Sequence, residues 1–504
     1  MAAALLLASC GTSSDDAGGS SAAGDRTLTI GAAAAPFPNL NPAQALFASY
    51  LPLTNQSILT LEEDGTISPG LAESFGYVGE GNTTFQLTFR QDAKFSDGSQ
   101  VNAAAAKTWF EYMAATPGPF QAALKVGSVD VVSEWEVRLN LAEANPLVPW
   151  VLSSWTQGWG GIASPNAVAD PDGLATNPAG AGPYKLDPAE TVTGDHYTFV
   201  PNEFYFDADS RTRWDKVVYR VISNPSTLLQ AVQTGQVDMY LAGGTTFPTV
   251  KTAESSGMAT ASFVGNTDLL FFGNLETGPF SDIRVRQAVN YALDRESINQ
   301  VTNVGYGTPT SALTTLDGDS ADLRGRYGHD PERARALLAE AGYPNGFATN
   351  TSCAATNLTQ CQAIAQSLMD IGITMKIEVD QTSSQLQLFQ SGQRETFVAL
   401  WPVNYNLFNY ASFWGGKATF RVSTPEWNDP EIDAAFQKAL TAPADESIAL
   451  MHQVVERAQE QAYFAPVFDI DQIFVYDPDK IAPIASSDSR FAYSMARLNL
   501  VEPK

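Results

Sequence analysis

One segment of the chain gathers the side chains best suited to hold a small organic molecule. Residues 402–416 are dense in aromatic and amide side chains. Aromatic faces stack on apolar or sugar rings, and amides exchange hydrogen bonds with hydroxyl and peptide groups. Around this segment we predict ligand contacts from Trp401, Asn404, Tyr405, Asn406, Phe408 and Trp414. The alternative, that part of this set lies in a hydrophobic core, stays open.

The elements before this segment predict where it lies in a fold. Residues 397–401 form a short apolar run typical of a buried strand. Upstream, an amphipathic helix over 362–371 ends at Gly372 and leads into strict alternation over 373–379, which indicates a strand. Because ligands of open α/β sheets bind beyond the carboxyl ends of strands, we expect the binding site at the end of the 397–401 strand.

Other elements carry clear start and stop signals. Asp330 and Asp429 each precede a proline, which predicts a helix capped by the aspartate. Residues 85–89 alternate as a strand, and 103–114 have helical composition. From 269 to 468 helices and strands alternate, which is typical of α/β architecture. The strand-like stretch over 464–476 is expected to lead the chain back to its first lobe.

The three cysteines divide into one and two. Cys10 follows Leu7-Ala8-Ser9, an order that resembles the bacterial lipobox, so we expect 1–10 to be a signal peptide and lipobox with Cys10 lipidated. Residues 11–26 are expected to be a flexible tether. Cys353 and Cys361 are an even pair, for which we expect a disulfide in an oxidising compartment.

Composition and motifs exclude several functions. The chain of 504 residues carries a net charge of −26, which disfavours nucleic acid as a partner. Its three histidines lie far apart in sequence, so we predict no metal site and no cofactor. We expect no enzymatic activity, because the serine-hydrolase, zinc-protease and nucleotide-binding signatures are absent. A carboxylate-dependent hydrolase remains a remote alternative among 55 acidic residues.

Five segments in order resemble the peptide/nickel-type (family 5) extracellular solute-binding proteins of ABC importers, the oligopeptide- and dipeptide-binding lipoproteins. The most similar is Pro279-Phe-Ser-Asp-Ile-Arg-Val-Arg-Gln-Ala-Val-Asn-Tyr-Ala-Leu-Asp-Arg295. The others are residues 65–75, 89–99, 177–185 and 330–343. We predict that Arg284, Arg286 and Asp294 form ion pairs that support the fold.

The resemblance implies a fold, partners and a location. The fold is the two-lobe, periplasmic-binding-protein-like α/β class with an extra subdomain inserted in lobe I and the ligand cleft between the lobes. The ranges that follow are 27–54, 162–262 and 470–504 for lobe I, 55–161 for the insert and 263–469 for lobe II. Such a protein delivers a small solute to an ABC permease and its ATPase. We expect a monomer outside the cytoplasm, anchored by lipid to the outer face of the bacterial cytoplasmic membrane.

The same resemblance bears on the solute. Peptide-binding members of the family use an aspartate after the strand that ends in tryptophan, to pair with the peptide's amino group. Here Asn404 and Asn406 occupy the two acidic positions, so the charge that offsets burial of an ammonium is missing. A peptide or peptide-like solute is the first expectation, and an oligosaccharide or another non-peptide solute is the alternative. Phe37, Trp155 and Trp159 are expected to contact the solute from lobe I and its insert.

Overall fold

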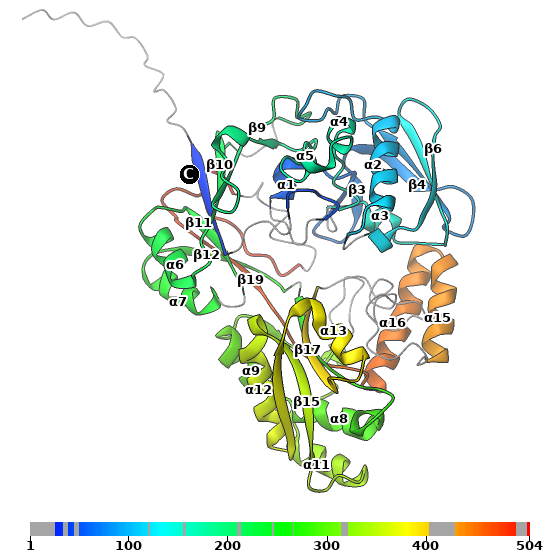
Figure 1. Ribbon diagram of the computed structural model, residues 1–504, viewed down its shortest axis with the longest axis vertical. Coiled ribbons are helices and arrows are strands. Elements are labelled where there is room, and N and C mark those ends of the chain that lie inside the picture. The colour runs from blue at the N-terminus through cyan, green and yellow to red at the C-terminus, as the bar shows by residue number, and fades with distance from the viewer. Residues whose placement is uncertain are drawn as a thin grey trace, which may run out of the picture.

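The computed structural model is an α/β protein built on three main sheets (Figure 1). It describes residues 26–33, 39–44, 50–118, 121–154, 158–208, 213–243, 246–265, 267–313, 321–402, 429–489 and 501–504. The candidates Cys10, Phe37, Trp155, Asn404, Tyr405, Asn406, Phe408 and Trp414 lie outside these residues.

The sheet of lobe I has seven strands. Their order is β12 (Ala259–Phe263), β19 (Gln472–Tyr476), β11 (Met239–Ala242), β1 (Thr27–Ala32), β10 (Lys216–Val221), β9 (His196–Pro201) and β8 (Tyr184–Leu186). β1 runs parallel to both β10 and β11, and the other neighbours are antiparallel. The described helices of this lobe are α1 (Leu51–Thr54), α6 (Pro225–Gln233) and α7 (Phe247–Ser255).

The insert has its own antiparallel sheet and core. The sheet order is β4 (Ala72–Tyr77), β5 (Thr84–Phe89), β7 (Glu136–Leu141) and β6 (Val126–Val131), beside a two-stranded sheet of β2 (Leu59–Leu61) and β3 (Ile67–Pro69). Its helices are α2 (Ala103–Ala115), α3 (Val148–Val151), α4 (Pro165–Val168) and α5 (Pro171–Leu174). The core of the insert also takes in Ala163, Leu174 and Ala181, which the sequence assigned to lobe I. The two short proline-led helices α4 and α5 offered no periodicity that would have placed them here.

Lobe II is a six-stranded mixed sheet with helices on both faces. The strand order is β14 (Thr308–Pro309), β18 (Ala465–Asp469), β13 (Thr267–Gly273), β17 (Thr396–Pro402), β15 (Phe347–Ala354) and β16 (Ile373–Asp380). The described helices of this lobe are α8 (Ile283–Ala292), α9 (Arg295–Asn303), α10 (Ala321–Arg324), α11 (Pro331–Glu340), α12 (Leu358–Met369), α13 (Thr382–Gln390), α15 (Pro430–Thr441) and α16 (Ala444–Glu460).

Alternation along β13 explains why both faces of this sheet are covered. Leu269 and Phe271 point into a core with residues of α8, α9, α11 and α12. Leu270 and Phe272 point into a second core with residues of α13, α15 and α16. A strand buried on both faces reads as a continuous apolar run, as β13 does. The predicted aspartate caps of α11 and α15 are confirmed, with Asp330 accepting from the N–H of Arg333 and Asp429 from that of Glu431.

Two short crossovers join the lobes. The chain passes from β12 to β13 between Phe263 and Thr267, and from β18 to β19 between Asp469 and Gln472. The predicted return of the chain over 464–476 is therefore confirmed, with one strand in each sheet. β12 runs to Phe263, one residue past the range expected for lobe I.

The apolar core does not stop at the crossovers. One buried cluster contains residues of α6, α7, β11 and β19 from lobe I together with residues of β13, α8, α9 and α12 from lobe II. Across this junction Phe247 of α7 stacks on Tyr306, with ring centroids 5.8 Å apart. The lobes therefore share buried apolar surface on the hinge side.

The arginines expected in ion pairs differ from one another. Arg284 pairs with Asp282 as expected, but Arg286 is buried and donates to the carbonyls of Phe280, Ser281 and Gln461. Asp294 caps α9 by accepting from the N–H of Ser297 and lies 3.9 Å from His329. Arg286 thus binds backbone carbonyls in place of the expected ion pair, since a guanidinium offers five donors that buried carbonyls can satisfy.

Candidate functional site

In lobe II the carboxyl ends of three strands meet at the edge from which the crossovers leave. β15 is parallel to both β16 and β17. The last residue of β17, Pro402, pairs with Thr267, the first residue of β13, and Asp268 pairs with Asp469, the last residue of β18. The chain therefore enters and leaves lobe II beside the carboxyl end of β17.

Lobe I presents the matching edge. Ala242, at the end of β11, pairs with Ile473 next to the second crossover. β1 is parallel to both β10 and β11, and Ala32 at its end lies opposite Val221 at the end of β10. The carboxyl ends of these three strands therefore lie on the same edge of the sheet. The carboxyl edges of the two sheets thus face each other across the crossovers. This is the position at which open α/β sheets bind ligands.

The structure places two of the predicted contact residues, and they differ. Trp401 is the penultimate residue of β17, is half-buried, and packs against the core that holds α13, α15 and α16. Trp159 has no exposed surface, and its ring centroid lies 6.3 Å from that of Phe110 in the core of the insert. Its carbonyl accepts a hydrogen bond from the indole of Trp109. Trp401 therefore stands at the carboxyl edge, whereas Trp159 has no surface to offer a solute in this arrangement.

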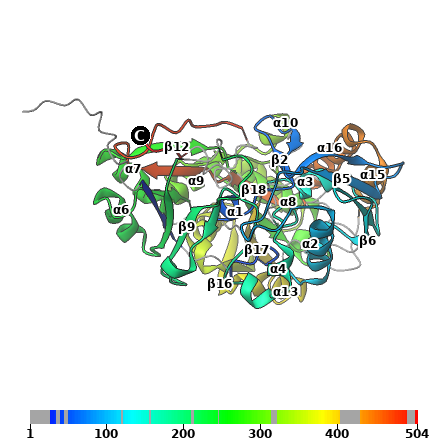
Figure 2. The ribbon, with the colours of Figure 1, turned by 90° about the horizontal axis from the view of Figure 1, so that it is seen from above.

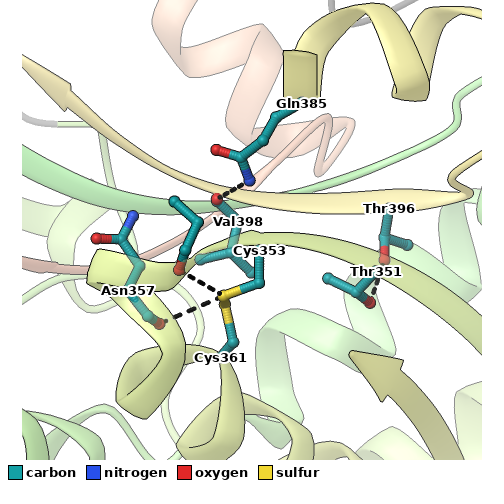
Figure 3. Close-up of a disulfide and its surroundings, with 8 residues drawn as sticks. Thr351, Cys353, Asn357, Cys361, Gln385, Thr396 and Val398 are labelled. Carbon is teal, nitrogen blue, oxygen red and sulfur yellow. Dashed lines mark hydrogen bonds between the residues drawn. A yellow bond between two sulfur atoms is a disulfide. The ribbon is translucent and has the colours of Figure 1, made fainter. Parts of the chain in front are cut away.

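A disulfide anchors the carboxyl end of β15. Cys353 near the end of that strand is bonded to Cys361 on α12, with their Cα atoms 6.5 Å apart, and this is the pair that the cysteine count predicts (Figure 3). The Sγ of Cys353 also contacts the carbonyl oxygens of Ala354 and Asn357, at 3.5 and 3.4 Å. The turn between β15 and α12, which lies at the cleft edge, is held by a covalent bond as well as by backbone contacts.

Side chains also fasten β17 to its neighbours. The hydroxyl groups of Thr351 on β15 and Thr396 on β17 lie 2.6 Å apart, and Gln385 of α13 donates to the carbonyl of Val398 at 3.4 Å (Figure 3). All three polar side chains are buried. Buried polar groups that satisfy one another fix the register of neighbouring elements. These side-chain contacts therefore add to the backbone pairing that holds β17, the strand that carries Trp401, between β13 and β15.

A carboxyl group lies where the two crossovers meet, and sequence reasoning missed it. Asp471 accepts a hydrogen bond from the N–H of Gly265 at 3.1 Å, which links one crossover to the other. Burial is the main cause that raises the pKa of Asp471 to about 6; the N–H groups of Gly265 and Gly307 act against this rise, and the nearby carboxyls of Asp469 and Asp488 add to it. The available signal was a pair of aspartates, 469 and 471, inside an otherwise apolar stretch.

A metal site and a membrane span each set requirements on the described residues. Within them no three histidine, cysteine, aspartate or glutamate side chains are grouped as metal ligands. No helix in the described part of the chain combines the length and apolar character needed to cross a bilayer.

Comparisons with known proteins agree with this geometry. A glutathione-binding protein, GsiB, from Salmonella typhi is 25% identical over 408 residues, which cover 78% of this chain and 77% of that protein. Among solved structures, NikA from Brucella suis in complex with Fe(III)-EDTA superposes with a TM-score of 0.81 at 22% identity, over 95% of this chain and all of NikA. DppA from Helicobacter pylori in complex with peptide STSA gives 0.75 at 20% identity, over 95% of this chain and 98% of DppA.

The family assignment rests on a family sequence model. The sequence model described as "Bacterial extracellular solute-binding proteins, family 5 Middle" matches residues 66–418. That range runs from β3 of the insert through β17 of lobe II. It contains the strands that form the two facing carboxyl edges, apart from β1 and the C-terminal strands β18 and β19. The chain belongs to the family 5 bacterial extracellular solute-binding proteins.

Proposed function

We propose that this chain is the substrate-binding component of an ABC importer, which captures a small solute between its lobes and delivers it to the permease. The observation that supports this best is the placement of the carboxyl edges of both sheets, which face each other across two short crossovers. A solute that touches both edges favours the closed arrangement of the lobes, because only that arrangement offers it both sets of contacts.

The functional units of the proposal are three. Lobe I is built on the seven-stranded sheet, lobe II on the six-stranded sheet, and the insert on the four-stranded sheet with its core extending to Ala181. We assign Cys10 to lipid anchoring and residues 11–26 to a tether, so that the protein works at the outer face of the membrane as a monomer. The proposed role is binding without chemical change of the solute.

The proposed solute is a peptide or a peptide-like molecule. Relatives of this chain include a protein named for glutathione and one solved with a tetrapeptide, but also one solved with a metal chelate. The amides of Asn404 and Asn406 lack the charge that favours a free ammonium, so we expect solutes whose amino end is blocked or linked otherwise. The aromatic and amide composition of 402–416 supports an oligosaccharide as the second candidate.

A thermal-shift screen of the purified chain tests the proposal. The panel contains tripeptides with free amino ends, their N-acetylated counterparts, glutathione, and mono- and oligosaccharides. A ligand present at 100 times its Kd stabilises the folded state by about 2.7 kcal/mol, so a hit is visible as a rise in Tm. Mass spectrometry of the ligand recovered from the complex distinguishes binding from hydrolysis. If no compound in any class raises the Tm, the proposed solute classes are wrong.

Asn404→Asp sharpens the choice of solute. A charge-assisted hydrogen bond contributes about 1 kcal/mol more than a neutral one, so affinity for free-amino tripeptides should rise roughly fivefold. Asn409→Asp adds the same charge to the same segment, outside the two positions of the family pattern, and serves as the control. Isothermal titration with a free and an N-acetylated tripeptide measures both variants. Equal gains in the two variants, or none in either, would show that position 404 does not contact the amino end.

A further inference from the structure

The insert contacts lobe II through residues that do not belong to either crossover. Asn82 lies in the turn between β4 and β5, and its Nδ2 donates to the carbonyl oxygens of Leu440 at 3.1 Å and Ala442 at 2.9 Å. These acceptors stand at the carboxyl end of α15 in lobe II. Figures 1 and 2 both show α15 and α16 beside the insert, on the side of the molecule opposite α6 and α7.

The acceptors are groups that a helix leaves without internal partners. The last carbonyls of an α-helix have no N–H four residues ahead, so they need a cap, water or another chain segment. Ala442 has extended backbone and ends α15, and no glycine follows to close the helix on itself. The amide of Asn82 therefore caps a helix that belongs to another lobe.

The insert holds Asn82 in the conformation that this contact requires. Its φ of 53° is left-handed, which asparagine tolerates better than most residues. The carbonyl of Asn82 accepts from the N–H of Asn145 at 3.0 Å, and the side chain of Asn145 in turn donates to the carbonyl of Ala123 and accepts from the N–H of Leu147. Tyr77 donates to the carbonyl of Asn145 at 2.6 Å. Several hydrogen bonds thus position a single amide.

An apolar contact lies beside the polar one. Leu147, which Asn145 holds in place, packs against the buried cluster of lobe II that includes Ala442, Leu450 and Phe464. We refer to Asn82 and Leu147 of the insert, with Leu440 and Ala442 of lobe II, as the clasp. It combines two hydrogen bonds with one partly buried leucine, and nothing covalent crosses it.

We propose that the clasp stabilises the closed arrangement of the lobes and breaks when they open. The insert then shifts the equilibrium between open and closed lobes toward the closed arrangement even before a solute binds. This rests on the proposed function, since closure matters only if a solute binds between the lobes. The apparent Kd varies inversely with the fraction of protein in the binding-competent arrangement. A weaker clasp therefore lowers affinity without altering any contact to the solute.

Variants at Asn82 separate the amide from the backbone. Asn82→Gly keeps the left-handed conformation and removes both hydrogen bonds. Asn82→Asp keeps the shape, cannot donate, and sets a negative charge against the negative end of the α15 dipole. Asn166→Ala is the control, because the amide of Asn166 donates to Asp97 within the insert. Both side chains are at least partly exposed, so the three variants are expected to fold, which circular dichroism checks.

The measurement needs no solute. Spin labels are attached at Glu134→Cys in the insert and Lys376→Cys in lobe II, in a Cys10→Ser background. Pulsed electron paramagnetic resonance then measures the distance between the two labels, which reports the arrangement of the lobes. Both labelled positions are exposed. We expect a short-distance population in the unsubstituted chain, a closed-to-open ratio about tenfold lower in Asn82→Gly, a larger loss in Asn82→Asp and no change in Asn166→Ala.

Two results would overturn the clasp. One is a distance distribution in Asn82→Gly and Asn82→Asp that matches the unsubstituted chain. The other is an unsubstituted chain with no short-distance population, because the clasp would then hold nothing without a solute. Neither result changes the outcome of the thermal-shift screen, and a screen without hits does not change the label distances. The clasp and the proposed function can therefore be refuted independently.

Discussion

Among the described residues, lobe II meets the rest of the molecule at two junctions of different construction. At the hinge junction two crossovers join the sheets, Asp471 accepts from Gly265, and a buried apolar cluster runs from lobe I into lobe II. At the clasp one amide makes two hydrogen bonds and one leucine is partly buried. Exposing apolar surface costs about 25 cal/mol per Å², whereas a hydrogen bond exchanged with water nets only about 1 kcal/mol. The hinge junction should therefore persist in every arrangement of the lobes, and the clasp should be able to open.

The largest expected effect is at the hinge junction. Phe247 has no exposed surface and stacks on Tyr306 of the other lobe. Phe247→Ala should lower the free energy of unfolding by about 3–5 kcal/mol, because it leaves a cavity between the lobes. Phe204→Ala, at a phenylalanine that is 37% exposed, is the control and should cost about 1 kcal/mol or less. Urea unfolding measures both, and similar costs at the two sites would contradict a shared core at the hinge.

The charge of Asp471 should make the hinge junction sensitive to pH. Its pKa is raised from 3.8 to about 6 in the folded chain. A raised pKa means that folding favours the protonated carboxyl, so the contribution is complete below about pH 4 and is lost as the pH rises through about 6. At 1.36 kcal/mol per unit, the loss reaches at most about 3 kcal/mol.

Asp471→Asn isolates this contribution from those of the other carboxyls. The amide is neutral at every pH and can still accept from Gly265. The variant should match the unsubstituted chain near pH 4 and be more stable above pH 6.5, by urea unfolding at each pH. A difference between the two proteins that stays constant from pH 4 to 7.5 would show that Asp471 does not titrate in this range.

Close packing of the crossovers predicts a smaller effect. A Cβ on Gly265 would lie 2.4 Å from the carbonyl oxygen of Ile470, a backbone atom of the other crossover. Gly265→Ala should therefore destabilise the fold by about 1–3 kcal/mol and shift the lobes against each other. Gly243→Ala is the matched control, since no atom of the described residues lies within 4 Å of a Cβ there, and it should change stability by about 0.5 kcal/mol or less. Equal stabilities of the two variants would mean that the crossovers are loosely packed.

The contrast between the junctions also explains what the sequence could predict. Elements whose signals are local, such as β16 with its alternation and α15 with its Asp429-Pro430 start, were predicted closely. Contacts made by residues distant in sequence were not. Asp471 and Asn82 act through partners 206 and about 360 positions away, and no local pattern announces such a pair. Arg286 was predicted as an ion pair because its carbonyl acceptors carry no side-chain signal. Of the candidate site, Trp401 could be placed at the carboxyl end of a strand from the apolar run over 397–401, whereas burial of Trp159 depends on the tertiary core of the insert.

The smallest effect on stability should come from the clasp. Because the clasp opens without unfolding either lobe, Asn82→Gly should change the free energy of unfolding by about 1 kcal/mol or less, and leave the urea m-value unchanged, since the surface exposed on unfolding stays the same. The same variant is expected to change the interlobe distance strongly, so stability and lobe arrangement separate at this position. At Phe247 they should change together, because the cavity weakens the core that both lobes share. If Asn82→Gly lowered stability as much as Phe247→Ala does, the clasp would be part of the fold and not a contact that opens.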